Sequence, residues 1–419
     1  MTMKFKDHNP PFPGTVRIQN ASVITPESVL PNASVEIENG RFRAVFPADE
    51  RGDWTSDADV CIDANGAYLM PGIIDLHSDK LESEITPRPG ADLPIDLALQ
   101  EIEQKFLACG ITTLFHAISL GYLVSEKAKS SHFTRAQMCY ATHEFAQTRA
   151  IARTYVHLRY EIQGHDLDKV YQAIDDGIVD LLSVMDHRPG HGQMSKERFL
   201  RNALKRGLPQ EIAENNYEEH HNREILSEEE IRKLVDYAHR RDLYVASHDD
   251  PSPGKVEIMR EMGINIAEFP LTLEAAEKAI ELGMKTIGGS ANSLRGGSLS
   301  DNLCVNTALS RNLISAMCSD YYPPALVHSV FKLAKENKMT LPQAVQLITL
   351  GAAKIVGLDE HLGSIETGKH ADFLLVDDSS GRPKVLQTWV GGRAVHQSNL
   401  RVSNPTSPFP LLTPLVQNA

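Results

Sequence analysis

Apolar residues in the middle of the chain follow two patterns that alternate along the sequence. Eight short apolar runs each end in polar residues, and these runs are 70–77, 111–119, 153–161, 179–187, 243–250, 264–270, 285–290 and 313–320. Between them lie segments whose apolar residues recur every three or four positions, as in amphipathic helices; examples are 228–242 and 272–283. Repeated strand–helix units favour parallel strands with right-handed crossovers, so eight of them predict an α/β fold, the (β/α)8 TIM barrel.

Both ends of the chain show another pattern, in which apolar and polar residues alternate over short stretches. Such alternation is typical of half-buried strands, and Asn-Gly or Gly-Gly turns join them into pairs. The stretches are 15–25, 33–46, 371–378 and 385–396. Neither end alone has enough strands to cover a sheet face. We therefore predict a small composite β-sandwich domain from residues 1–68 and 370–419, with the barrel at 69–369.

The segment 192–226 separates the fourth and fifth strand candidates and is too long for a plain loop. Its composition predicts one or two additional helices. Their position after a barrel strand makes a lid over the barrel end one hypothesis for this segment.

Composition narrows the classes of function. The 419 residues are 42% hydrophobic and 23% charged, as in ordinary globular proteins, and the net charge of −13 disfavours nucleic acid or an anionic membrane as a partner. The five cysteines are scattered without a C-x-x-C pair, which excludes a thiolate zinc site. Without a signal-like N-terminus or a bilayer-length apolar run, we expect a cytoplasmic protein, with homo-oligomerisation left open.

Three histidines and three carboxylates stand at predicted carboxyl ends of strands, where the chemistry of such barrels is found. They are His77, Asp79, Glu161, His187, His248 and Asp320. Each alone is more simply explained as a polar strand end. Because side chains alternate along a strand, however, His77 and Asp79 can point the same way, and the whole set indicates a metal site.

Imidazole and carboxylate ligands without thiolate suit zinc, manganese or iron. Six candidates exceed what one ion needs, so we expect two divalent ions, zinc first among them, sharing Glu161 about 3.5–4 Å apart. Such a pair activates a bridging water, and Asp320 is the candidate to accept its proton.

A second set of residues predicts a small anionic substrate. The glycine-rich segment 288–302 follows the seventh strand candidate, where barrels often bind phosphate. Basic groups follow other strand ends, although any one of them can be an incidental surface charge. The candidate substrate-binding residues are Lys80, Arg88, Arg159, Arg188, His191, Asn292, Arg295, Gly296 and Gly297.

The motifs themselves resemble a known family. The runs "IDLHSDKLE", "LRYE", "MDHRPGHGQ", "ASHDD", "NSLRGGSLSDN" and "CSDYYP", with the closing "ADFLLVD" and "WVGGRAV", are similar to the amidohydrolase superfamily and, within it, to the PhnM-type phosphonate-metabolism family. The resemblance implies a metal-dependent diphosphatase that cleaves α-D-ribose 1-methylphosphonate 5-triphosphate to the 5-phosphate and diphosphate. It also implies that the six strand-end residues hold the metals. Lys80 stands where that family is expected to have asparagine.

Two other functions remain open at the level of the sequence. An amidohydrolase acting on a cyclic amide, an N-acyl group or an amino-heterocycle would keep the metal site, but a neutral amide has no use for several cations. A non-catalytic scaffold would keep the barrel, although the intact set of candidate ligands disfavours it.

Overall fold

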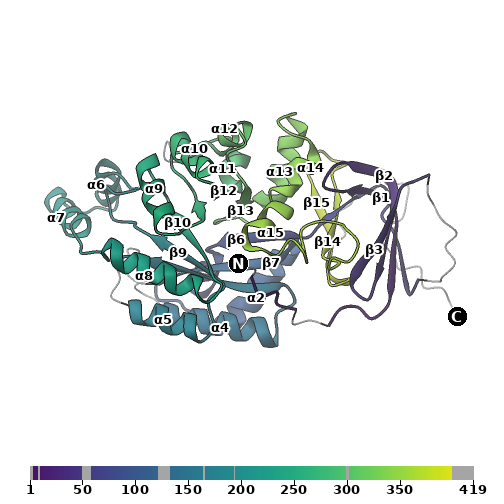
Figure 1. Ribbon diagram of the computed structural model, residues 1–419, viewed down its shortest axis with the longest axis horizontal. Helices are drawn as coiled ribbons and strands as arrows, with labels where there is room; N and C mark the ends of the chain where they lie inside the picture. The colour runs from purple at the N-terminus through teal and green to yellow at the C-terminus, as the bar shows by residue number, and fades with distance from the viewer. Residues whose placement is uncertain are drawn as a thin grey trace.

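The computed structural model describes residues 3–7, 10–49, 58–120, 133–163, 166–192, 194–298 and 302–398. Two sheets organise the chain, and Figure 1 shows them side by side, with the helices gathered around one of them. Parts of the predicted segments lie outside the described residues, namely 1–2, 8–9, 50–57 and 399–419 of the β-domain, and 193 and 299–301 of the two long loops.

The barrel sheet and the sheet of the small β-domain, called the small sheet, have eight strands each. In the barrel sheet the strands follow sequence order and are joined by parallel pairing. Its first and last strands meet through a parallel bridge between Ser78 and Asp320, and the Asp320 amide donates to the His77 carbonyl at 3.0 Å. The strands are β6 (Ile73–Ser78), β7 (Ile111–Leu120), β8 (Arg153–Glu161), β9 (Leu181–Met185), β10 (Tyr244–His248), β11 (Ile266–Glu268), β12 (Lys285–Gly289) and β13 (Ala316–Cys318). The predicted barrel, with its eight strands, is confirmed.

The helices that cover the barrel form where apolar residues recur at helical spacing. In α8 (Glu228–His239), for instance, Ile231, Leu234 and Val235 are buried, and Ser227 begins the helix in a capping box with Glu230. The others are α1 (Lys80–Ile85), α2 (Ile95–Ala108), α4 (Arg135–Thr148), α5 (Leu167–Asp175), α9 (Pro253–Glu261), α10 (Leu273–Glu281), α11 (Ser290–Arg295), α12 (Val305–Ser310), α13 (Ala325–Lys335), α14 (Leu341–Gln346) and α15 (Leu350–Val356).

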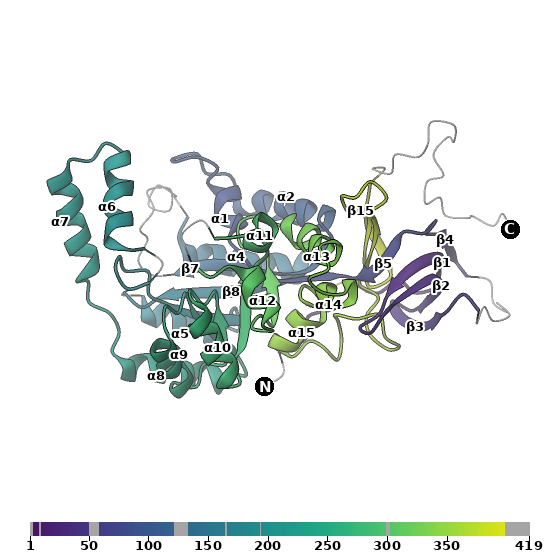
Figure 2. The same cartoon turned by 90° about the horizontal axis from the view of Figure 1, so that it is seen from above.

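The long segment after β9 forms two further helices, α6 (Lys196–Lys205) and α7 (Gln210–His221). They pack on each other and project from the barrel on the side away from the small sheet (Figure 2). The helices themselves were expected, and whether they close over the barrel stays a prediction.

The small sheet combines both ends of the chain, as predicted. The β14–β5 pairing is antiparallel and joins a C-terminal strand to an N-terminal one. The sheet order is β16-β15-β14-β5-β1-β2-β3, with β4 beside β1. Its strands are β1 (Thr15–Ile24), β2 (Val29–Glu38), β3 (Arg41–Phe46), β4 (Val60–Asp63), β5 (Tyr68–Pro71), β14 (Phe373–Asp377), β15 (Lys384–Val390) and β16 (Arg393–Gln397).

Apolar side chains from the strands fill the interior of the barrel below its carboxyl end. This cluster includes Leu76, Tyr155, Leu181 and Ile266, and N-terminal Met3 packs into it. On several strands, the side chain two residues beyond these apolar residues is polar. The candidate site therefore lies directly above the apolar interior. Across the described part of the chain, no helix has the length and apolar character that a membrane crossing requires.

Candidate active site at the carboxyl end of the barrel

The six residues predicted as metal ligands come together at the carboxyl ends of the strands. In three groups of side chains, one ligand atom per residue lies within 4.8 Å of the others, and the groups are His77–His248–Glu268, His187–His248–Asp249 and His77–Asp79–Asp320. A cavity of about 570 Å³ opens above them. Glu268 and Asp249 join the predicted set.

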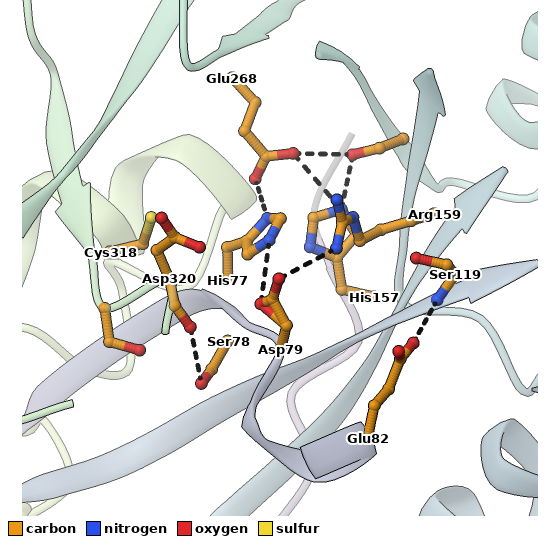
Figure 3. Close-up of polar contacts among 12 residues, drawn as sticks. His77, Ser78, Asp79, Glu82, Ser119, His157, Arg159, Glu268, Cys318 and Asp320 are labelled. Carbon is orange, nitrogen blue, oxygen red and sulfur yellow. Dashed lines mark hydrogen bonds and ion pairs between the residues drawn. The ribbon is translucent and has the colours of Figure 1, made fainter. Parts of the chain in front are cut away.

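Glu268, at the end of β11, connects two of the histidines. One carboxylate oxygen lies 2.7 Å from His77 Nδ1 (Figure 3), and the other lies 2.9 Å from His248 Nδ1. Since an ionised carboxylate only accepts, each ring donates its Nδ1–H, which leaves both Nε2 atoms as electron-pair donors. Metal-binding histidines are commonly oriented by a carboxylate in this way.

Beneath Glu268, two further buried polar residues complete the hydrogen bonding. Ser183 Oγ lies 3.0 Å from Glu268 Oε2 and 2.6 Å from His157 Nε2, while His157 Nδ1 lies 3.0 Å from the Leu76 carbonyl oxygen. Burial lowers the pKa of His157 to about 3, so its ring is neutral at pH 7. The Ser183 hydroxyl donates its single hydrogen to Glu268 Oε2.

Glu161 and Asp249 hold the third histidine between them. His187 Nδ1 lies 2.5 Å from Glu161 Oε1, and His187 Nε2 lies 3.5 Å from Asp249 Oδ2. Burial disfavours protonation of His187, but the contacts with Asp249 and Glu161 raise its pKa to about 9. The imidazole therefore carries a charge that a metal ion would replace.

Asp320 and Asp79 face each other across the seam between β13 and β6. Burial and the Asp79 carboxylate raise the pKa of Asp320 to about 7, which is the range that suits a group that exchanges protons at neutral pH. Arg159 lies on the other side of Asp79, with its Nη1 3.6 Å from Asp79 Oδ2. Both carboxylates thus point into one acidic pocket edged by a cation.

Left-handed backbone at three strand ends helps to aim these side chains. Asp249, Phe269 and Asp320 have φ values of 55°, 54° and 59°. Aspartate tolerates this conformation, whereas a bulky residue such as Phe269 adopts it rarely and at a cost of order 1–3 kcal/mol. Strain of this kind, held at the rim of a barrel, is typical of a functional site.

The donor set fits divalent metal ions. Asp79 Oδ1 and Glu161 Oε2 are buried, and neither has a hydrogen-bond partner within the described residues. Buried carboxylate oxygens without partners are costly unless a cation binds them. With the free Nε2 atoms of His77 and His248, they offer the nitrogen and oxygen ligands that zinc, manganese or iron accept.

The predicted substrate-binding residues divide into two groups. Four of them line the cavity, namely Arg159, Asn292, Arg295 and Gly297. Gly296 ends α11 with a φ of 84°, which favours glycine.

The remaining basic residues point elsewhere and do not line the cavity. Arg188 pairs with Asp186 at 2.9 Å, and His191 stacks on His221. Lys80 begins α1, and Arg88 is exposed. Their assignment to the substrate stays a prediction.

Several site residues escaped the sequence argument. They are Glu82, Arg135, His157, Ser183, Asp249 and Glu268. Strand phase could have indicated His157, since it alternates in step with Arg159 and Glu161. An acid ending the apolar run 264–268 was the available signal for Glu268, whereas Arg135 begins a helix and carries no such signal.

Comparison with known proteins identifies the family of the chain. Residues 197–395 match the model of the amidohydrolase family. The crystal structure of ochratoxinase from A. niger shares the fold, with a TM-score of 0.63 and 16% identity, covering 92% of this chain and 96% of that one. Imidazolonepropionase of Fusobacterium nucleatum subsp. nucleatum is 23% identical over 392 residues, covering 84% of this chain and 87% of the relative.

The chain belongs to the amidohydrolase family and is a hydrolase of that superfamily, whose members generally bind divalent metals. The resemblance seen in the motifs is thereby confirmed. Over 386 residues the chain is 30% identical to the α-D-ribose 1-methylphosphonate 5-triphosphate diphosphatase of Escherichia coli (strain K12), covering 90% of this chain and 99% of that protein.

Proposed function

We propose that this protein is a metal-dependent diphosphatase that hydrolyses a phosphoanhydride bond of a ribose phosphonate 5-triphosphate and releases diphosphate, in phosphonate catabolism. The similarity to the E. coli diphosphatase along nearly the whole chain supports this assignment. The observation that carries it is a cavity whose wall combines the carboxylate and imidazole groups with arginines; those are Arg135, Arg159, Arg198 and Arg295.

Four guanidinium groups lining one cavity favour a polyanionic substrate. Arginine binds phosphate oxygens through pairs of N–H donors, and it neutralises charge that develops on a departing phosphate. The protein as a whole carries a net charge of −13, yet four arginines line this one cavity. Such local concentration is expected where a substrate of opposite charge binds.

The metal site would use two ions, with zinc the first candidate and manganese or iron the alternatives. His77, Asp79, His187, His248 and Asp320 would hold them, and Glu161 would lie between them. Bound there, divalent ions supply Lewis-acid activation of the attacking water and of the phosphoryl oxygens. Asp320 would accept the proton of that water, and Arg159 would hold the substrate beside Asp79.

Amide hydrolysis is the second candidate, because imidazolonepropionases and a deaminase are also among the relatives. The 5'-deoxyadenosine deaminase of Methanosarcina acetivorans is 25% identical over 390 residues, covering 86% of this chain and 84% of the relative. A neutral amide or heterocycle gains nothing from four arginines, which is why we rank this reaction second.

Product analysis separates the two reactions. The purified protein, loaded with zinc or manganese, is incubated with α-D-ribose 1-methylphosphonate 5-triphosphate and, separately, with a panel of cyclic amides, N-acyl compounds and amino-heterocycles. We expect diphosphate from the first and no turnover of the panel. Turnover of an amide without diphosphate release would replace the proposal by the second candidate.

Asp320→Asn provides the matched variant for this assay. The amide has the shape of the carboxylate but cannot accept a proton, so kcat should fall by about 10²- to 10⁴-fold. Substrate affinity, measured separately by equilibrium binding, should change little. A variant that retains its kcat would remove Asp320 from the proposed role.

A further inference from the structure

Arg135 is a buried cation with one carboxylate partner and unused N–H donors within the described residues. Only 7% of the residue is exposed, yet it lines the cavity at the start of α4. Its Nη1 donates to the Met138 sulfur at 3.3 Å, and its Nη2 lies 2.9 Å from Glu82 Oε2. A guanidinium has five N–H donors and thioether sulfur is a weak acceptor, so within the described residues its hydrogen-bonding capacity is underused.

Arg159, on strand β8, also contacts a methionine sulfur and a carboxylate. Its Nε donates to the Met185 sulfur at 3.3 Å, and its Nη1 is 3.6 Å from Asp79, beyond hydrogen-bond length. A buried charge that lacks strong acceptors is costly. Arg159 and those N–H groups of Arg135 that engage neither Glu82 nor Met138 can therefore donate to an anionic group of a ligand in the cavity that both residues line.

Glu82 distinguishes the Arg135 end of this wall. The carboxylate lies against Arg135 and accepts from the Ser119 amide at 3.4 Å (Figure 3). It would repel a diphosphate group, which carries several negative charges, but it is a good acceptor for a sugar hydroxyl.

Arg295 offers a different environment on the opposite, glycine-rich segment. Its side chain is exposed, and no carboxylate within the described residues forms an ion pair with it. A polyanionic diphosphate therefore finds an uncompensated cation at Arg295 and a compensated one at Arg135. The two ends of the proposed substrate thus have separate matching environments.

Building on the proposed diphosphatase function, we propose that Arg135 and Glu82 form the subsite for the ribosyl phosphonate end of the substrate. Arg135 binds the phosphonate oxygens, together with Arg159, and Glu82 accepts a hydrogen bond from a ribose hydroxyl. The pair therefore determines specificity for the phosphonate, while the triphosphate extends toward Arg295.

Two substrates that differ only at the phosphonate test this subsite. kcat/KM is measured for α-D-ribose 1-methylphosphonate 5-triphosphate and for D-ribose 5-triphosphate, with the parent enzyme, Arg135→Gln and Arg295→Gln. Arg135→Gln should lower kcat/KM for the phosphonate substrate about 10- to 100-fold, the range for losing hydrogen bonds to a charged group, and change the other substrate by less than about threefold. Arg295→Gln should lower both values alike.

The ratio of the two kcat/KM values is independent of how much protein is folded, because both substrates are measured on one preparation. Arg135→Lys, which keeps the charge but not the paired N–H donors, should restore part of the ratio. A loss that is equal for both substrates in Arg135→Gln would overturn the subsite while leaving the diphosphatase assignment intact. Absence of diphosphate from both substrates with the parent enzyme would overturn the assignment and the subsite together.

Discussion

At the scale of single residues, Glu268 orients two histidines of the site although it is not among the residues that line the cavity. Burial alone would raise the pKa of its carboxyl group, but His77, His157 and His248 hold that pKa well below its ordinary value. The carboxylate is therefore ionised and fixes the direction of two imidazole rings at once. Its contribution to metal binding is indirect, through the orientation of His77 and His248.

Glu268→Gln should weaken metal binding by roughly 10- to 100-fold, the usual effect of losing an orienting partner. The amide can accept from one ring only, and its NH2 group opposes the other ring. Competition with a chelator of known affinity measures the change. Glu274→Gln, an exposed acid on the helix that follows β11, is the control and should bind metal as the parent does.

An unchanged metal affinity in Glu268→Gln would show that the histidines hold their orientation without this carboxylate.

Glu268 also illustrates what the sequence alone could not predict. His77, His187 and His248 were predictable as a set, because they recur with carboxylates at the carboxyl ends of several predicted strands. A single glutamate within an apolar run becomes meaningful only when its two partners, far apart in the sequence, are seen beside it.

At the scale of elements, the strands could be predicted from the sequence. Which side chains they place in the site was harder to predict. Eight apolar runs of strand length gave the barrel because each run ends in polar residues. The pairing of β6 with β7, by contrast, is irregular between Asp75 and Ser78, where Leu76 faces the apolar interior and His77 reaches the site. Neither this irregularity nor the arginine at the start of α4 produces a periodic pattern in the sequence.

Helix α2 is tied to the start of β8 by one carboxylate. Glu103 accepts hydrogen bonds from the amides of Ile151 at 2.7 Å and Ala152 at 2.9 Å, and burial raises its pKa to about 7. Below the ordinary carboxyl pKa of 4.5, both the folded and the unfolded chain bind this proton. Between 4.5 and 7 only the folded chain keeps it, so its contribution to stability declines as pH rises through that window.

Glu103→Gln should remove this pH dependence. The free energy of unfolding of the parent, relative to that of the variant, should fall by on the order of 2–3 kcal/mol between pH 4.5 and pH 8. Urea denaturation of both proteins across that range measures the difference. Parallel pH profiles for parent and variant would mean that Glu103 is ionised in the folded protein throughout.

At the scale of the whole molecule, Arg153 connects three distant parts of the chain. On the barrel it begins β8, and its guanidinium bonds to Asp372 at 2.8 and 3.1 Å in the segment leading into the small sheet. It also bonds to Asp7 at 2.7 Å, and Phe5 packs on its guanidinium. The barrel, the small sheet and the N-terminal segment therefore share one buried cation.

Arg153→Gln should destabilise the protein by about 3–5 kcal/mol, because it leaves the Asp372 carboxylate buried without its partner. The free energy of unfolding in guanidinium chloride measures this. Arg149→Gln is the matched control, since its ion pair with Asp96 is exposed and should contribute at most about 1 kcal/mol. Equal stability of the two variants would contradict a structural role for the buried connection.

The central claim is that water attacks a phosphoanhydride at this carboxylate, histidine and arginine site. Hydrolysis of α-D-ribose 1-methylphosphonate 5-triphosphate in ¹⁸O-labelled water, with products resolved by mass spectrometry, tests it most directly. Because the proposed attack is on the α-phosphorus, the account predicts one unlabelled diphosphate per turnover and one ¹⁸O atom in the α-D-ribose 1-methylphosphonate 5-phosphate product, only with divalent metal added. Orthophosphate as the released product, or label in diphosphate, would contradict it.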